Sequence, residues 1–357
     1  MLPHWDAAYR RVHDGINYRL RSLAGGRFAS LCRPASIILL LTEHCNARCV
    51  HCDIWKNRGR EDSPSVEQWK TLLSDIRRWL GPAQVALSGG EALLKPWAPE
   101  MVRHGVRAGL AMEILTHGFW DDLSRIEETA RARPLRITIS VDGIGDTHTL
   151  IRGRERFWEK TLRTIKTLVR LRKSEDLGYA IRLKTVIMRQ NLNDLASVAR
   201  FAAAHGLDAF YQPVEQNYNT PEDPRWWEHS ENWPDDPGRA IEAVNELIRL
   251  KSAGFPVANS PAQLDAMARY FRDPESSRVS VQGHSAHERR LHCTALTMLQ
   301  IQADGGVTVC AGMPVVGNIR HAPIDEIWRN RPRWWQEGCC LTRRCSDAEK
   351  QAFQLIR

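Results

Sequence analysis

Three cysteines in one short segment have the spacing of an iron–sulfur site. Cys45, Cys49 and Cys52 lie in the stretch TEHCNARCVHCDIW, separated by three and then two residues. Three thiolates on one tight loop can bind three irons of a 4Fe–4S cubane and leave the fourth iron without a protein ligand. Such an open iron can bind a small molecule through an amino and a carboxylate group and pass it an electron. The segment therefore indicates a redox site that also binds a ligand.

A zinc site is the alternative for this segment. Structural zinc is held by four cysteine or histidine ligands, and His44 or His51 could supply the fourth. The cysteines, however, follow a buried apolar run in a repeated pattern rather than lying in a small finger. This context favours the cluster over zinc.

The elements that must position this loop are read from hydrophobic periodicity. From residue 36 onward, short apolar runs alternate with longer amphipathic ones, which is typical of repeated βα units around a parallel sheet. A helix is expected between the first two strands, with Ser63 as its cap and Pro64 at its first position. The six expected strands are Ile37–Thr42, Gln84–Ser88, Met112–Thr116, Ile137–Asp142, Leu183–Met188 and Phe210–Pro213. This pattern predicts an α/β fold, a partial (β/α)6 barrel with its ligands at the carboxyl ends of the strands.

Four parts of the chain are expected. Residues 1–35 form an N-terminal extension and residues 36–225 the barrel core. A lid and helical linker, residues 226–290, begins in a Trp- and Pro-rich stretch, with helices near 238–253 and 261–272. Residues 291–357 form a small cysteine-rich unit, in which a D-G-G turn between two alternating runs predicts a β-hairpin.

Composition limits the class of protein. In 357 residues, 43% are hydrophobic and 26% charged, which is ordinary for a folded protein. The net charge of +8 is spread along helical stretches, so a nucleic-acid partner is disfavoured. The sequence has no long apolar run and no secretory signal pattern, so we expect a cytoplasmic protein with no membrane partner. Nine cysteines in such a chain are better explained by metal binding than by disulfides.

The segment CNARCVHC resembles the signature of the radical S-adenosylmethionine (SAM) superfamily, whose loop follows the first barrel strand. The resemblance implies that Cys45, Cys49 and Cys52 hold a SAM-binding 4Fe–4S cluster and that His51 packs on the adenine of SAM. An external electron donor of the flavodoxin or ferredoxin type would reduce the cluster. SAM would then be cleaved to methionine and a 5′-deoxyadenosyl radical, which removes a hydrogen atom from the substrate.

The ends of the second and third strands extend the resemblance. Gly89, Gly90 and Glu91 resemble the GGE motif that binds the amino group of the SAM methionine. His117 stands where the family often has an asparagine. Without the resemblance, Gly-Gly-Glu could equally be a plain turn between a strand and a loop.

Polar residues at the end of the fourth strand and just after it also resemble those of the family. Ser140 and Asp142 resemble the pair that faces the SAM ribose, although they could also begin a turn. Arg152 and Gly153 resemble an Arg-Gly pair of members that carry an additional C-terminal cluster domain. The resemblance therefore implies that Ser140, Asp142 and Arg152 contribute to cofactor binding.

Five cysteines near the C-terminus resemble those of SPASM and twitch domains. They are Cys293, Cys310, Cys339, Cys340 and Cys345. The resemblance implies a second, auxiliary 4Fe–4S cluster, with ligands Cys293, Cys310, Cys345 and one of the adjacent pair Cys339 and Cys340. A structural zinc site is the alternative.

The adjacent pair supports a more specific hypothesis. Soft thiolates suit soft ions, so Cys339, Cys340 and Cys345 could bind arsenite. Some radical SAM enzymes of organoarsenical biosynthesis resemble this chain, and there the 3-amino-3-carboxypropyl group of SAM is transferred.

The leading prediction is a radical SAM enzyme that modifies a small molecule in a biosynthetic pathway. A ribosomal-peptide (RiPP) maturase is disfavoured because only about 35 residues precede the first strand. A zinc or iron–sulfur RNA-binding protein is the alternative of another class. Candidate substrate contacts are Lys184, Tyr211, Gln212 and Glu215.

Overall fold

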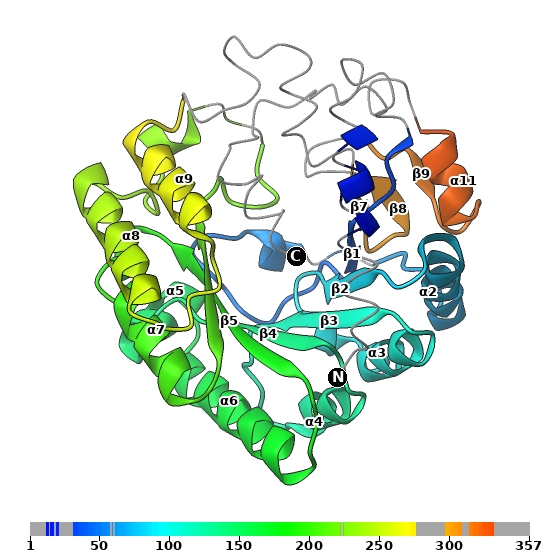
Figure 1. Ribbon diagram of the computed structural model, residues 1–357, viewed down its shortest axis with the longest axis horizontal. Helices are drawn as coiled ribbons and strands as arrows, with labels where there is room; N and C mark the ends of the chain where they lie inside the picture. Colours follow the sequence, from blue (N-terminus) through cyan, green and yellow to red (C-terminus); the bar gives the residue numbers. More distant parts are fainter. Residues whose placement is uncertain are drawn as a thin grey trace.

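The computed structural model describes residues 12–13, 15–17, 19–20, 31–57, 59, 61–221, 223, 225–275, 297–308 and 314–331. All six predicted strands are present as β1 (Ser36–Leu40), β2 (Gln84–Ser88), β3 (Ala111–Thr116), β4 (Arg136–Ser140), β5 (Ala180–Ile187) and β6 (Asp208–Pro213). They are parallel and adjacent in chain order. The sheet runs from β6 to β9 without closing, so the protein is a mixed α/β partial barrel (Figure 1).

Helices lie around the outside of this curved sheet (Figure 1). They are α2 (Val66–Leu80), α3 (Ala98–Arg107), α4 (Ser124–Arg131), α5 (Asp146–Arg152), α6 (Phe157–Ser174), α7 (Leu195–Ala204), α8 (Pro237–Ser252), α9 (Pro261–Arg272) and α11 (Ile324–Arg329). Short 3-10 turns are η3 (Ile54–Lys56), η4 (Ala92–Leu94), η5 (Arg189–Asn191) and η6 (Trp226–Glu228). Among the described residues, no helix is both long and apolar enough to cross a membrane.

The start of α2 differs from the prediction. Its N-cap is Ser65 rather than Ser63, because the Ser65 hydroxyl accepts from the Gln68 backbone N–H while the Gln68 side chain accepts from the Ser65 N–H. This reciprocal capping box satisfies two backbone donors that a start at Ser63 would leave without helical partners.

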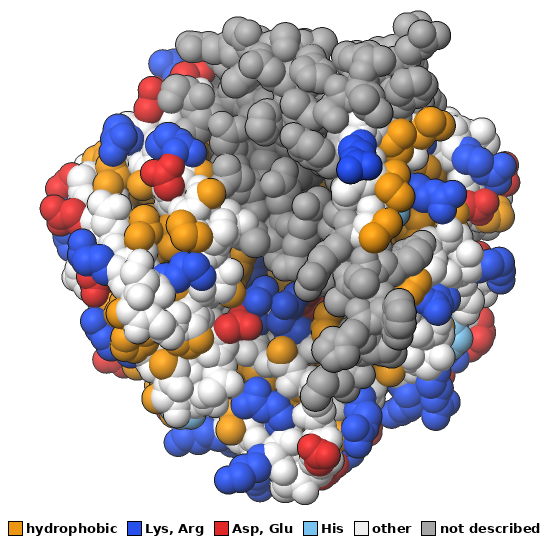
Figure 2. Space-filling view, viewed as in Figure 1, with side chains coloured by type: hydrophobic (Ala, Val, Ile, Leu, Met, Phe, Trp, Pro, Cys, Tyr) orange, Lys and Arg blue, Asp and Glu red, His pale blue; other side chains and the backbone are white. Residues whose placement is uncertain are grey.

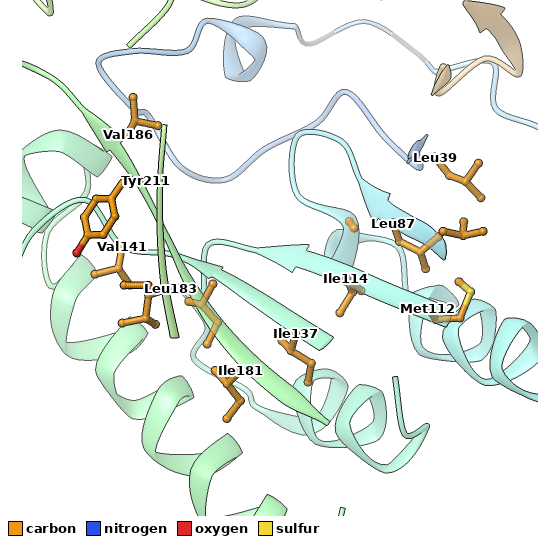
Figure 3. Packing of buried hydrophobic residues seen from close by; sticks show 14 of the residues in the cluster. Leu39, Leu87, Met112, Ile114, Ile137, Val141, Ile181, Leu183, Val186 and Tyr211 are labelled. Atoms are coloured by element: carbon orange, nitrogen blue, oxygen red, sulfur yellow. The ribbon is translucent and has the colours of Figure 1, made fainter. Parts of the chain in front are cut away.

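The side of the sheet that faces the helices forms the hydrophobic core. Side chains alternate along a strand, so every second residue of each strand points to the same side. Figure 3 shows such residues on successive strands, among them Leu39, Leu87, Ile114, Ile137 and Leu183, all fully buried. Burying apolar surface is the main stabilising contribution, and here it fixes the strand ends in space.

A C-terminal hairpin joins the same sheet. The strand β7 (Met298–Ile301) pairs in parallel with β1, and β8 (Gly306–Thr308) pairs antiparallel with β7. The strand β9 (Gly317–Asn318) follows, and α11 packs on α2 through Trp79 and Trp328, whose ring centroids are 6.0 Å apart. The part of residues 291–357 that is described therefore continues the barrel sheet.

Candidate active site

The cysteine loop, residues 41–53, leaves the carboxyl end of β1. The Cys49 side chain is 8% exposed, and Cys45 and Cys52 are half-buried. Burial raises the pKa of Cys45 to about 12 and that of Cys52 to about 11, and it also raises the pKa of Cys49. Three thiols in a poorly solvated loop stay protonated at neutral pH unless a bound cation stabilises their thiolate forms.

Glycines of the GGE segment hold the start of this loop. A Cβ on Gly89 would lie 2.3 Å from the Thr42 carbonyl oxygen, and one on Gly90 would lie 2.3 Å from that of His44. The Gly90 N–H donates to Thr42 O at 2.7 Å, and the Glu91 N–H donates to His44 O at 2.9 Å. Both positions therefore require glycine for the backbones to meet, and this contact fixes the cysteine loop on β2.

The Glu91 side chain ties β2 to the end of β3. Its carboxylate accepts hydrogen bonds from Leu93 N, Thr116 Oγ1 and His117 N at 2.8–3.1 Å. Burial raises the pKa of Glu91 to about 7 even though these donors favour the charged form. The carboxylate is thus oriented by protein groups at the edge where SAM is expected.

His117 continues this network to the cysteine loop. Its Nδ1 accepts from the Phe119 N–H at 2.9 Å, so in the neutral ring the proton lies on Nε2, 2.7 Å from Asn46 Oδ1. Burial lowers the pKa of His117 well below its ordinary value, so the ring is neutral. The residue that replaces the family's usual asparagine thus connects the end of β3 to the loop.

The helix α5 places a buried cation against Cys49. Arg152 Nη1 lies 3.6 Å from Cys49 Sγ, and Arg152 Nη2 lies 2.6 Å from Asp142 Oδ2. Asp142 is fully buried and also accepts from Val186 N at 2.9 Å. Both oxygens of Asp142 have protein partners, so in this structure Asp142 positions Arg152. That Asp142 contacts SAM stays a prediction, and these interactions disfavour it.

Gly153, at the end of α5, is the site of another close backbone approach. Its φ is +67°, and a Cβ there would lie 2.2 Å from Arg48 O. Arg48 N donates to Arg152 O, and Val50 N donates to Ile151 O, both at 3.0 Å. The end of α5 is therefore attached to the loop at the residues between its cysteines.

Aromatic side chains cover one side of the cysteines. Ala47, Cys49 and Phe157 form a buried apolar cluster, and Cys45, Cys52 and Phe119 pack against it. The Phe119 and Phe157 rings are stacked with centroids 4.4 Å apart. Such a wall limits the access of water to this side of the sulfur atoms and strengthens electrostatic interactions near it.

The residues present fit a 4Fe–4S cluster with SAM. Within the described residues, no three His, Cys, Asp or Glu side chains are grouped closely enough to hold one metal ion. His44 Nε2 lies 3.0 Å from Gly59 O and so has another partner. His51 Nδ1 is buried without a hydrogen-bond partner among described groups, so the loop has a polar atom that a ligand could satisfy. Burial lowers the pKa of His51 to about 4, so its ring is neutral.

The Trp-rich segment after β6 contributes contacts that the sequence did not reveal. The side-chain amides of Asn217 and Asn232 donate to Val50 O at 3.2 and 3.0 Å. Asp53 N donates to Tyr218 O at 3.2 Å. Asn232, in the segment expected to be a lid, thus contacts the cysteine loop, as do Asn217 and Tyr218 at the end of the expected barrel core. Asparagines are common in loops, so only their distance in space from Val50 could have identified them.

The remaining residues predicted for the site have different positions in the structure. The Tyr211 ring points away from the barrel interior, and its hydroxyl donates to Leu195 O of α7 at 2.9 Å (Figure 3). Ser140 and Lys184 are opposite each other on β4 and β5. Five predicted ligands, Cys293, Cys310, Cys339, Cys340 and Cys345, lie outside the described residues.

An open parallel barrel with a three-cysteine loop and a GGE edge defines an iron–sulfur enzyme of the SAM-cleaving kind. The model of the radical SAM superfamily matches residues 39–202, and that of SPASM, an iron–sulfur cluster-binding domain, matches residues 293–349. These two segments span more than half of the chain. The chain belongs to the radical SAM superfamily and carries a SPASM domain, and its cofactors are SAM, a 4Fe–4S cluster and an auxiliary iron–sulfur cluster of the SPASM domain.

Relatives of known activity are similar along most of their length. The AdoMet-dependent heme synthase of Methanosarcina barkeri is 27% identical over 306 residues, 83% of this chain and 82% of that protein. Pre-heme d1 synthase of Dinoroseobacter shibae is 26% identical over 335 residues, 85% of this chain and 78% of that protein. Streptococcus suis SuiB bound to the precursor peptide SuiA has a TM-score of 0.64 at 15% identity, covering 93% of this chain and 71% of that one. This last likeness shows the fold alone.

Proposed function

We propose that this radical SAM enzyme modifies a small-molecule substrate held at the carboxyl end of the barrel. Cys45, Cys49 and Cys52 would bind the SAM-cleaving cluster, and SAM would lie between His51, the GGE edge and Ser140. When bound, the reduced cluster supplies the electron that breaks a carbon–sulfur bond of SAM and so generates the radical. The observation that carries the proposal is the attachment of one cysteine loop to three elements, β2, β3 and α5.

The protein's own residues do three things in this proposal. Arg152 places a positive charge 3.6 Å from the Cys49 sulfur, which favours the thiolate that a metal requires. Gly89, Gly90 and Gly153 let neighbouring backbone segments approach the loop closely, which would hold it in position for SAM. The Phe119 and Phe157 wall would exclude water from the side of the cysteines that it covers.

A small-molecule substrate is supported by two heme-type synthases that match along most of their length. The PqqA peptide cyclase of Streptomyces rochei, 24% identical over 90% of this chain and 86% of that protein, favours a peptide substrate instead. In the SPASM domain, Cys293, Cys310, Cys345 and one of Cys339 and Cys340 would bind an auxiliary cluster. An external electron donor would supply the reducing electron.

Anaerobic reconstitution followed by dithionite and SAM tests the proposal. We expect 5′-deoxyadenosine on chromatography and about eight irons per chain if both clusters are present. Methylthioadenosine in its place would instead support transfer of the aminocarboxypropyl group, as in the arsenite hypothesis. If protein with a full iron content formed neither 5′-deoxyadenosine nor methylthioadenosine, that result would contradict SAM cleavage. Turnover of a peptide but of no small molecule would contradict the proposed substrate class.

A further inference from the structure

The inward side of the barrel sheet carries charges that the function above does not use. Side chains alternate along each strand, so the residues between the core positions point into the barrel. Figure 2 shows Lys or Arg together with Asp or Glu side chains in the hollow at the centre of this view, where Figure 1 has β3, β4 and β5. The charged residues at inward positions of β1 to β6 are Glu113, Arg136, Arg182, Lys184 and Asp208.

Four of these five charges neutralise one another in pairs. Arg136 donates to both oxygens of Glu113, with Nε at 3.0 Å and Nη2 at 2.9 Å, and Thr138 also donates to Glu113. Arg182 forms a bidentate ion pair with Asp208 on the neighbouring strand. Each arginine charge is therefore neutralised by a carboxylate, so neither pair offers a net positive charge to a ligand.

Lys184 is the inward charge that remains. In the part of the chain that the structure describes, its ammonium makes no ion pair or hydrogen bond, yet the side chain is half-buried. Burial lowers its pKa, and the nearby carboxylates of Glu215, Glu113 and Asp142 act in the opposite direction while Arg152 acts with burial. Of these carboxylates, Glu113 and Asp142 are held by arginines, and Glu215 has a further interaction of its own.

The position of Lys184 puts this charge beside the cysteine loop. Lys184 lies two residues beyond Arg182 toward the carboxyl end of β5, opposite Ser140 of β4. Its charge is also near enough to His51 to help lower the pKa of that ring, after the larger effect of burial. Lys184 therefore lies where the expected SAM site meets the barrel interior.

We propose that Lys184 binds a carboxylate of a ligand in the barrel interior. A half-buried ammonium without a partner is stabilised when an anion satisfies it by a charge-assisted hydrogen bond. A lysine that is unpaired among the described residues offers a single positive charge, which matches a carboxylate better than a phosphate dianion. The carboxylate belongs to the substrate or to SAM, and the experiment distinguishes the two. The proposal makes the substrate class given above more specific. The role of Lys184 in the reaction rests on that proposed function, whereas the binding of a carboxylate does not.

Competitive labelling of the oxidised holoenzyme tests the binding without turnover. A water-soluble N-hydroxysuccinimide acetate labels lysines, and mass spectrometry compares Lys184 with Lys166, an exposed lysine of α6. Propionate at about three times its Kd should slow the labelling of Lys184 about fourfold and leave Lys166 unchanged. Propionamide, which has the same shape without the charge, should protect neither. A failure here is separate from a failure of SAM cleavage, because no electron is supplied.

Comparing SAM with decarboxylated SAM identifies the source of the carboxylate. If saturating SAM protects Lys184 and decarboxylated SAM does not, the ligand is the SAM carboxylate. If propionate still protects when SAM is bound, the ligand is the substrate's carboxylate. The proposal is overturned if propionate protects no better than propionamide and SAM no better than its decarboxylated form.

Two variants give an independent readout by titration of SAM. If the carboxylate is that of SAM, Lys184→Met weakens SAM binding about tenfold or more while Lys184→Arg, which keeps the charge, retains most of the affinity. If the carboxylate is that of the substrate, all three proteins bind SAM equally. Iron content and melting temperature show that the variants are folded. Equal loss in both variants would indicate a packing role and contradict the proposal.

Discussion

The two sides of the same strands have opposite chemistry. On β1, Leu39 is fully buried against the helices, whereas its neighbour Leu40 points inward and is half-buried. On β3, Met112 and Ile114 lie in the core, while Glu113 between them is held by Arg136 inside the barrel. The outer side stabilises the fold by burying apolar surface, and the inner side together with the cysteine loop carries the chemistry. Substitutions on the two sides should therefore affect different measurements.

The largest expected effect is from removing a thiol of the loop. In Cys49→Ala we expect no SAM cleavage and loss of the iron of the SAM-binding cluster, because three cysteines are the minimum for holding the cubane. Chromatography of 5′-deoxyadenosine and iron analysis measure this. The matched control is Cys32→Ala, which removes a cysteine that is also buried but lies outside the loop. Normal iron content in Cys49→Ala would contradict the assignment of this ligand.

The next effect concerns the buried charges of the inner side. Glu113→Ala leaves Arg136 without its partner and should lower the free energy of unfolding by about 3–5 kcal/mol, measured by urea denaturation. Burial raises the pKa of Glu113, but the hydrogen bonds and charge of Arg136 outweigh it and hold the pKa below its ordinary value. The pair therefore stabilises the fold at pH values above the ordinary glutamate pKa, and this contribution is lost as the pH falls through the lower folded value.

A double variant distinguishes the loss of the ion pair from the loss of side-chain packing. With Glu113→Leu and Arg136→Met together, no unpaired charge is left, so we expect a much smaller loss of stability than in Glu113→Ala. The difference in stability between the wild type and the double variant should also shrink at acid pH. If the double variant were as unstable as the single one, packing rather than charge would explain the effect.

On the outer side, we expect Leu39→Ala to lower the free energy of unfolding by about 2–5 kcal/mol, through lost burial and the cavity that remains. Leu40→Ala, one residue along the same strand, is the control and should cost less because its side chain is half-buried. Iron content after reconstitution should be normal in Leu39→Ala at temperatures where it is folded. Equal losses at the two positions would contradict the division between the two sides.

The sequence predicted what depends on neighbours in the chain. Six strands and the cysteine loop follow from periodicity and spacing, which are local properties, and the resemblance directed attention to GGE and Arg152. Contacts between distant segments were not predicted, such as His117 with Asn46 or Asn232 with Val50. The predicted N-cap of α2 was wrong by two residues, because Ser63 and Ser65 have the same capping chemistry. The reciprocal hydrogen bonds with Gln68 select Ser65.

The smallest predicted effect tests whether the segment after β6 belongs to the site. Asn232→Ala removes a hydrogen bond of 3.0 Å to Val50 O and should cost about 0.5–1.5 kcal/mol of stability. Because Val50 lies between Cys49 and Cys52, we also expect faster release of iron to a chelator from the folded protein. Asn193→Ala, at an exposed asparagine that contacts Arg239, is the control and should release iron at the wild-type rate. If Asn232→Ala is less stable but keeps its iron, the segment supports the fold alone. If it instead releases iron faster than the less stable Leu39→Ala, the contact protects the cluster loop. Residue 232 would then belong to the site on the inner side of the barrel.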